Sequence, residues 1–571
     1  MRQAKRQVAL ALLLLASALF FAVVLLSVQL RAPIGPMYWD VYTYYDAANR
    51  IFGGQIPARD FFAPAGPLGY AIASLWIALF PEGQPSLLVH WSMMTLTVPL
   101  MAYMVSSLPS EMRKFAVWLV LPFVFFSLLP FNGKEFYPFP GSDAFGLYNR
   151  HVCLILFPLV AALVFVQKPG PVVALMTMSM LALFFVKITG FVAAGVICAF
   201  ALLAGRVRLR DAMLSTALLI AVLSAIEFST GLVLNYLRDI LLLAEMNSGT
   251  LLPRLVQSLS INFGVTAALA ALALVILIGD RSRLNELLSF ARRQRTPATI
   301  ASLFDHPSFW LIAVILTGVL FETQNTGSQA MIFSWPVLLA VLIRQQDWFR
   351  SPSMVAAIAI LAGAAYLPLI VGGVERAARA YLGSIVSDVV LEHENLKTLG
   401  AVTMRPHVLK KSDTKMSSYV RNRPAFEEMA ASGDSPSNFL YSELDFQITF
   451  LRSVDQAIKS IRKLEARHAV RFEIIMALNF TNPFPYLMDR QAPLHLTVGA
   501  DPFRAVPKAG SAELLAVEAA DLVLVPTCPV TSANLVLERI YAAGLTKHRR
   551  IKLDDCFDAY VHTELSGWIT P

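Results

Sequence analysis

The sequence predicts a polytopic α-helical membrane protein that ends in a small α/β domain outside the membrane. Hydrophobic residues make up 56% of the 571 positions and charged residues only 15%, and the mean hydropathy is +0.59. A water-soluble protein of this length carries far more charge. The long apolar segments all precede residue 373, and the sequence beyond it has a polar, soluble character. We therefore expect a membrane domain, 1–372, and a C-terminal domain, 373–571.

The first apolar segment, Val8–Leu30, follows three basic residues near the N-terminus. A secretory signal has the same order, but its apolar core is shorter and a small-residue cleavage site follows it. This pattern indicates a retained anchor. Ten further segments are apolar over the length that crosses a bilayer. They are 86–107, 115–130, 151–167, 171–187, 189–205, 212–233, 257–279, 307–322, 329–344 and 353–372.

Basic residues predict the orientation, because Lys and Arg are enriched in the cytoplasmic loops of membrane proteins. They gather in five loops: Arg113-Lys114, Lys168, Arg206–Arg210, Arg281–Arg295 and Arg344–Arg350. These loops and the N-terminus share the inner side if segment 67–81 forms a re-entrant or surface helix rather than a span. The prediction is then about 11 spans, with a first outer loop, 31–85, and the C-terminal domain on the outer side.

The formal net charge of +8 follows from these inner loops, so we expect no nucleic-acid partner and take the lipid bilayer as the surrounding medium. Four cysteines divide evenly between the two domains. Cys153 and Cys198 lie in predicted spans. Cys528 and Cys556 lie in the outer domain, where an oxidising compartment permits a disulfide, although spacing alone does not establish the pairing.

The C-terminal domain has short apolar runs typical of strands at 439–441, 472–477, 494–498 and 522–526. Helical spacing of apolar residues predicts helices around 454–464 and 534–545. Together these elements indicate one small α/β core. The polar turn 479–485 is either ordinary turn chemistry or a binding loop.

The first outer loop concentrates residues that can do chemistry. It contains Trp39-Asp40, Tyr44-Tyr45-Asp46, Arg59-Asp60-Phe61-Phe62 and Gly66-Pro67-Leu68. Asp40 is placed to cap a helix that Gly53-Gly54 ends, and we expect this helix in the membrane interface, with its aromatic residues at the lipid headgroups. The structural alternative makes Asp40 only a helix cap and Asp60 only a partner of Arg59.

This loop resembles the first outer loop of GT-C type glycosyltransferases, the polyprenyl-phosphate-sugar-dependent enzymes that include aminoarabinose transferases and protein O-mannosyltransferases. In that family an acidic residue just after the first span is the catalytic base, which implies Asp40 here. The family often has a second acid beside it, whereas Val41 follows Asp40 in this chain. Asp46 and Asp60 are the candidates for the second acid, and we prefer Asp60.

Glycosyl transfer from a polyprenyl phosphate needs a base for the acceptor hydroxyl, and cationic side chains or a divalent metal ion at the leaving phosphate. The predicted substrate-binding residues lie in the outer loops or at the outer ends of spans: Arg59, Tyr148, Asn149, Arg150, Lys187, Gln324 and Asn325. The alternative for Arg150 and Lys187 is that they reach the headgroups as membrane-edge residues. The polar pair Gln324-Asn325 suits a sugar or acceptor, or forms an ordinary loop.

The resemblance implies an inverting glycosyltransferase of the outer face of a bacterial inner membrane. Its partners would be a polyprenyl-phosphate-linked sugar donor and a cell-envelope glycan or lipid-linked acceptor. Two alternatives share the multi-span layout. A polysaccharide polymerase or ligase usually carries its key arginines and a histidine in a large late outer loop. A flippase or transporter of a lipid-linked sugar needs ionisable residues near the middle of its spans, where this chain has few.

Overall fold

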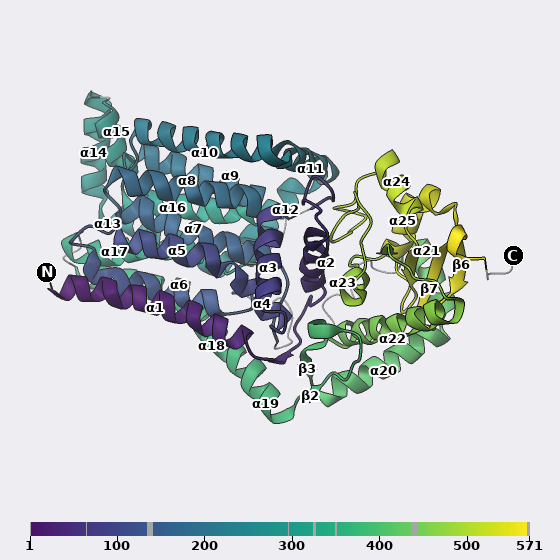
Figure 1. The fold of residues 1–571 in the computed structure, drawn as a ribbon. Coiled ribbons are helices and arrows are strands. Elements are labelled where there is room, and N and C mark those ends of the chain that lie inside the picture. Colours follow the sequence, from purple (N-terminus) through teal and green to yellow (C-terminus); the bar gives the residue numbers. More distant parts are fainter. Residues whose placement is uncertain are drawn as a thin grey trace.

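The computed structural model describes residues 2–63, 65–133, 141–294, 296–323, 327–348, 351–434 and 444–567. A bundle of long helices forms one end of the molecule and a mixed α/β domain forms the other, with the two termini at opposite ends (Figure 1). The bundle helices are α1 (Arg2–Leu26), α5 (Met94–Ser106), α6 (Ala116–Leu128), α7 (Leu147–Phe165), α8 (Pro169–Val186), α9 (Ile188–Leu203), α10 (Leu209–Thr230), α13 (Phe263–Gly279), α16 (Pro307–Phe321), α17 (Trp335–Trp348) and α18 (Pro352–Ala377).

Six helices in the described part of the chain are long and apolar enough to cross a membrane, and the number is eight if each of two sharply bent helix pairs is one span. Three shorter apolar helices accompany them. One of these is α3 (Pro67–Leu79), whose 13 residues rise only about 20 Å, less than the apolar thickness of a bilayer. The number of eleven spans stays a prediction.

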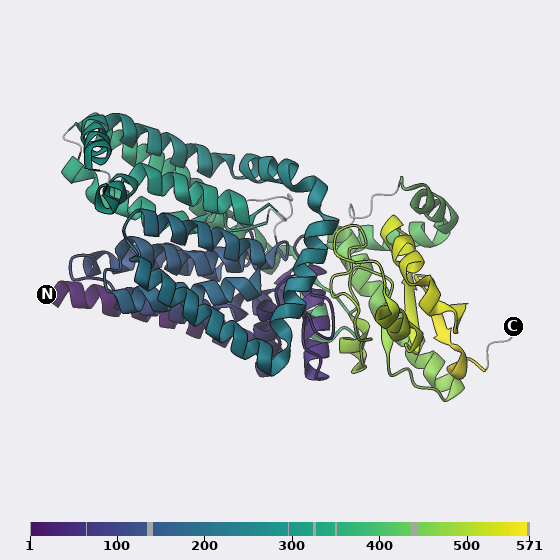
Figure 2. The same cartoon turned by 90° about the horizontal axis from the view of Figure 1, so that it is seen from above.

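A layer of shorter helices lies between the bundle and the α/β domain in both views (Figures 1 and 2). It consists of α2 (Asp40–Phe52), α3, α4 (Pro85–Ser92), α11 (Leu232–Met246) and α12 (Leu251–Ile261). The basic helix α14 (Arg281–Gln294) and α15 (Pro297–Phe304) lie at the opposite end of the bundle, the end at which the N-terminus also lies (Figure 1). The bundle therefore separates its most basic helix from the α/β domain.

The α/β domain is built on a mixed sheet with the strand order β4-β5-β7-β6. Strands β4 and β5 are parallel, and β7 is antiparallel to both of its neighbours. Its elements are α20 (Pro406–Arg421), α21 (Arg423–Ser432), α22 (Leu444–His468), β4 (Ile475–Ala477), α23 (Phe484–Met488), α24 (Ser511–Glu518), β5 (Leu522–Pro526), α25 (Ser532–Tyr541), β6 (His548–Lys552) and β7 (Phe557–His562). Buried Val523 and Val525 of β5 pack in one core with Leu537 and Tyr541 of α25.

The predicted strand at 522–526 is confirmed, and the one at 472–477 is present in its second half as β4. The prediction at 494–498 is wrong, because this segment uses its backbone for other contacts. The His495 N–H donates to the Asp60 carbonyl oxygen at 2.6 Å, and the Val498 N–H donates to that of Phe62 at 3.0 Å. The predicted strand at 439–441 lies outside the described residues. Strands β6 and β7 were not predicted, because the charged residues of β6 obscure its periodicity.

A second small sheet joins the start of the first outer loop to the segment 389–404. Strand β1 (Ala32–Pro33), just after α1, pairs in parallel with β3 (Val402–Met404), and β2 (Val389–Val390) pairs antiparallel to β3 on its other side. Helix α19 (Gly383–Ser387) leads into this sheet from α18. The first outer loop thus starts against the C-terminal domain.

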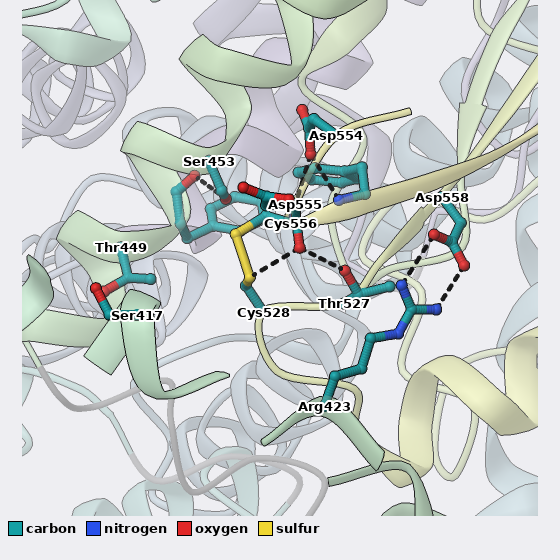
Figure 3. The surroundings of a disulfide bond; sticks show 12 residues. Ser417, Arg423, Thr449, Ser453, Thr527, Cys528, Asp554, Asp555, Cys556 and Asp558 are labelled. Atoms are coloured by element: carbon teal, nitrogen blue, oxygen red, sulfur yellow. Dashed lines mark hydrogen bonds and ion pairs between the residues drawn. A yellow bond between two sulfur atoms is a disulfide. The ribbon is translucent and has the colours of Figure 1, made fainter. Parts of the chain in front are cut away.

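A disulfide joins Cys528 and Cys556, which lie just after β5 and just before β7 (Figure 3). Nearby, the Arg423 guanidinium of α21 binds both carboxylate oxygens of Asp558, at 3.0 and 2.6 Å. The Arg423–Asp558 pair holds α21 against the sheet. The disulfide settles the cysteine pairing that spacing alone left open.

Candidate active site

Asp40 lies at the start of α2, where the chain turns from the small sheet into the helix. The turn is closed by a hydrogen bond of 2.9 Å from the Asp40 N–H to the Met37 carbonyl oxygen. Asp40 lines a cavity of about 510 Å³ between the helical bundle and the α/β domain. Among the described residues its carboxylate has neither a hydrogen-bond donor nor an ion-pair partner. Asp40 is therefore an acid held open to a cavity rather than a helix cap.

A second carboxylate, Asp143, lies near Asp40, although sequence analysis did not single it out. Two glycines bring it there, because segments 33–36 and 141–144 run in direct contact. The Ser142 N–H donates to the Pro33 carbonyl oxygen at 3.0 Å. A Cβ added at Gly141 would lie 2.3 Å from the Ile34 carbonyl oxygen, and one added at Gly35 only 2.4 Å from that of Ser142. Only glycines permit this approach.

The Asp143 carboxylate influences the ionisation of Asp40. Burial raises the pKa of Asp40 well above its usual range, the negative charge of Asp143 raises it further, and the positive charge of Arg150 acts in the opposite direction. Burial also raises the pKa of Asp143. Its two carboxylate oxygens accept from the Asn132 side chain at 2.9 Å and the Phe145 N–H at 2.7 Å. Asp143 is thus fixed in place, while Asp40 faces the cavity.

Arg150, predicted at the phosphate, is fully buried in α7 and is not among the residues that line the cavity. Its guanidinium donates to the Asp143 carbonyl oxygen. Its charge attracts both Asp40 and Asp143. Arg150 is therefore buried close to the two acids, where its charge partly balances theirs.

Lys187 occupies the one-residue break between α8 and α9, and it lines the cavity. Its ammonium donates to the Asn149 side chain at 2.6 Å and to the Phe321 carbonyl oxygen at 2.9 Å. It also lies 5.2 Å from the ring centre of Tyr148, which lines the same cavity. The structure brings together three of the predicted substrate-binding residues, Tyr148, Asn149 and Lys187.

Two further cations line the cavity and were missed in the sequence. Arg254 comes from α12 and Arg504 from the loop that follows Gly499 in the α/β domain. Asn247, at the end of α11, connects them: its Oδ1 accepts from Arg254 Nη2 at 3.3 Å, and its Nδ2 donates to the Arg504 carbonyl oxygen at 3.0 Å. Arg254 lies just before the predicted span 257–279, and this position of a basic residue was the signal in the sequence that could have identified it. Nothing in the local sequence marks Arg504.

The other predicted acids are engaged elsewhere. Asp60 Oδ2 accepts from the Ile56 N–H at 2.7 Å and pairs with Arg59 at 2.8 Å. Neither residue is among those that line the cavity, and 42% of the Arg59 side chain is exposed. Asp46 forms a buried ion pair of 2.9 Å with Arg50, one turn along α2. Gln324 and Asn325 lie outside the described residues.

The aromatic residues of α2 contact protein rather than lipid headgroups. Trp39 packs against Phe480 of the α/β domain with ring centres 5.0 Å apart, and Tyr45 packs against Tyr486 at 4.9 Å. Tyr38, Trp39, Tyr42 and Tyr45 are each at most 2% exposed. The interface-helix expectation is corrected here, because the α/β domain covers the face that was assigned to the membrane surface.

No group of three or more His, Cys, Asp or Glu side chains that could hold a metal ion occurs in the described part of the chain. Of the neighbouring acids Asp40 and Asp143, only Asp40 lines the cavity, and both oxygens of Asp143 already accept hydrogen bonds. The need for a divalent metal ion stays untested.

No family model and no curated protein matches the chain. Solved structures resemble it at low similarity over most of its length. ArnT from Cupriavidus metallidurans in the apo state has a TM-score of 0.40 and 12% identity, covering 97% of this chain and 98% of that one. ArnT from the same organism bound to undecaprenyl phosphate has a TM-score of 0.38 and 13% identity, covering 98% of this chain and 98% of that one. The archaeal oligosaccharyltransferase AglB from Archaeoglobus fulgidus, in complex with an inhibitory peptide and a dolichol-phosphate, has a TM-score of 0.25 and 12% identity, covering 98% and 75%. Similarity at this level does not assign the chain to a family.

Proposed function

We propose that this protein is an inverting glycosyltransferase that moves a sugar from a polyprenyl-phosphate donor to a hydroxyl of a cell-envelope glycan or lipid acceptor. The observation that carries the proposal is the Asp40 carboxylate, which opens without a described partner into a cavity that cations also line. A base and a set of cations in one cavity are the two elements that this transfer requires.

Asp40 acts as the base. Its raised pKa suits this role, since a base is most effective when its pKa approaches the working pH. It takes the proton of the acceptor hydroxyl while the acceptor oxygen bonds to the anomeric carbon. The bond from that carbon to the phosphate oxygen breaks, and the electron pair leaves with the polyprenyl phosphate. A single displacement inverts the anomeric centre and forms no covalent enzyme intermediate.

The leaving phosphate gains negative charge, which Lys187 and Arg254 are placed to balance at the cavity wall. Asp143 and Arg150 act as positioning residues. Asp143 keeps the pKa of Asp40 raised, and Arg150 limits the cost of two neighbouring acids. We assign the role of second acid to Asp143 rather than to Asp60, because the charge of Asp143 acts on Asp40, whereas the Asp60 carboxylate is bound by the Ile56 N–H and by Arg59.

We further propose that the cavity faces the outside of a bacterial inner membrane. The basic helix α14 and the N-terminus lie at the end of the bundle away from the α/β domain (Figure 1), as expected if that end is cytoplasmic. The Cys528–Cys556 disulfide supports an oxidising compartment for the α/β domain. The cavity lies on the same side as this domain.

The test is transfer by the purified protein in proteoliposomes, with a panel of radiolabelled polyprenyl-phosphate sugars and a crude envelope-lipid extract as acceptor. We expect labelled acceptor with inverted anomeric configuration, together with an equal amount of free polyprenyl phosphate. Asp60→Asn serves as a matched control for Asp40→Asn. Retained configuration in the product, or equal transfer by Asp40→Asn and wild type, would refute the mechanism. Uptake of intact labelled donor without release of polyprenyl phosphate would favour a transporter.

A further inference from the structure

Arg504 brings a positive charge from the α/β domain to the cavity that the membrane part supplies with Arg254 and Lys187. The three residues are far apart in the sequence. Arg504 is close enough to repel the charges of both other cations. Asp501 attracts Arg254 and Glu322 attracts Lys187, and these attractions partly offset the repulsion.

Cations held together at one cavity repel one another, and this repulsion costs free energy. A bound dianion removes the repulsion and accepts charge-assisted hydrogen bonds from the guanidinium groups. Asn247 holds the arrangement in place, since one side-chain amide bonds both to the Arg254 guanidinium and to the backbone of Arg504. Such an arrangement favours an anion with several oxygens, such as a phosphate.

The surroundings of Arg254 favour a phosphate that is attached to a lipid. Arg254 lines the cavity, whereas Leu252, Val256 and Leu259 of the same helix are exposed, at 70%, 59% and 44%. A headgroup at Arg254 therefore has an apolar helix surface beside it. A free phosphate ion would gain nothing from that surface, while a polyprenyl chain would bury apolar area on it.

We propose that Arg504 completes the binding site for the donor phosphate and that Asn247 positions it. This inference rests on the proposed function. The α/β domain then takes part in donor binding instead of only covering the cavity or selecting the acceptor. The same domain is hydrogen-bonded to the first outer loop, for example by the 2.6 Å contact from Arg50 Nη1 to the Pro493 carbonyl oxygen. These contacts thereby fix the position of Arg504 relative to Asp40.

The experiment measures the binding of radiolabelled polyprenyl phosphate to the full-length protein in nanodiscs. Arg504→Gln is expected to weaken binding about tenfold or more, because a charged hydrogen-bond donor is lost. Arg504→Lys should recover part of the affinity, and Asn247→Ala should lower it to an intermediate value. Lys508→Gln is the matched control, since Lys508 is an exposed cation of the same loop that does not line the cavity.

Unchanged affinity in Arg504→Gln would overturn the inference, and so would an equal loss in Lys508→Gln. Inorganic phosphate and nanodiscs rich in phosphatidylglycerol form two competition arms. Equal competition by either one would overturn the assignment to a polyprenyl-linked phosphate. Transfer assays on the same samples distinguish failure of this inference from failure of the proposed function. A wild type that transfers sugar while Arg504→Gln binds normally refutes only this inference, whereas a wild type that neither binds polyprenyl phosphate nor transfers sugar refutes the proposed function.

Discussion

Residues 37–52 and residues 56–63 of the first outer loop both carry aspartates among aromatic side chains, yet of these aspartates only Asp40, in the first segment, lines the cavity. Asp40 has no described partner for its carboxylate, and burial raises its pKa. Asp60 is bonded to the Ile56 N–H and to Arg59. Despite partial burial, these hydrogen bonds lower its pKa. The Asp40 carboxylate is thus available to a bound molecule, as the proposed base must be, whereas the Asp60 carboxylate is used to shape a turn.

The comparison also explains why the second segment is needed. Its backbone carbonyls at Asp60 and Phe62 accept hydrogen bonds from the 494–498 segment of the α/β domain. The first segment contributes Trp39, whose N–H donates to the Gln447 side chain at 3.1 Å. In the proposed mechanism one half of the loop supplies the base, and both halves hold the α/β domain over the cavity.

The largest expected effect belongs to Asp40→Asn. Loss of the general base should lower the transfer rate by about 10²–10⁴-fold. Binding of polyprenyl phosphate should stay within about twofold of wild type, since the phosphate site is formed by other residues. Single-turnover kinetics and equilibrium binding on the same preparation check both expectations. A parallel loss of binding and rate would mean that Asp40 supports the cavity instead of acting as a base.

The same substitution should make the protein more stable near neutral pH. A carboxyl whose folded pKa is raised adds stability below its unfolded pKa, and this contribution is lost as the pH rises through the folded value. Asparagine has no charge to bury, so the gain over wild type should appear above about pH 4 and grow until Asp40 is fully ionised. Thermal unfolding of both proteins between pH 4 and pH 8 measures it. A constant difference across this range would contradict a raised pKa.

A smaller loss of rate is expected from a substitution that changes the distance between Asp40 and Asp143 but keeps both side chains. In Gly141→Ala the new Cβ would meet the Ile34 carbonyl oxygen at 2.3 Å, so segments 33–36 and 141–144 must move apart. A displacement of about 1 Å in a catalytic group costs up to about 10²-fold in rate. Gly372→Ala is the control, since nothing lies within 4 Å of the added Cβ there. Equal activity of the two variants would show that the Asp40–Asp143 spacing does not matter.

Removing the charge of Asp143 should act mainly on the pH dependence. In Asp143→Asn the pKa of Asp40 falls, because a neighbouring negative charge is gone. The acidic limb of the pH–rate profile should therefore move to lower pH, with a loss of about tenfold at the plateau because the weaker base is less effective. A pH–rate profile of the single-turnover step checks the direction. An unshifted limb would remove the proposed coupling of the two acids.

Sequence patterns predicted the parts of this site that depend on local order along the chain. Asp40 follows the first apolar segment directly, and Lys187 interrupts an apolar hairpin, so both stand out without a structure. Asp143 and Arg504 were not predictable in this way. The former reaches the site through a backbone contact with segment 33–36, and the latter through a loop of the α/β domain. Such long-range contacts leave no periodicity or spacing in the sequence.

The same limit explains the misplaced strand at 494–498. Its alternating apolar residues satisfy the strand pattern, but their backbone partners lie more than 400 residues earlier, in the first outer loop. The aromatic residues of α2 show the converse case. Their composition is typical of a membrane interface, yet a second domain covers them. Composition indicates which surfaces must be kept from water, and only the fold decides what covers them.

The smallest effect is expected for Asp60→Asn, which tests the second half of the loop. The Asn side chain can still accept from the Ile56 N–H, and the lost ion pair is largely exposed, so the transfer rate should stay within about threefold of wild type. A lowered pKa means that Asp60 stabilises the protein above its unfolded pKa, and this contribution disappears as the pH falls through the folded value. The variant should thus unfold at a slightly lower temperature at pH 7 and at the same temperature as wild type in strong acid. A loss of rate as large as that of Asp40→Asn would indicate that Asp60 takes part in the reaction. Weakened docking of one turn would not explain such a loss if the unfolding temperature at pH 7 were nearly unchanged.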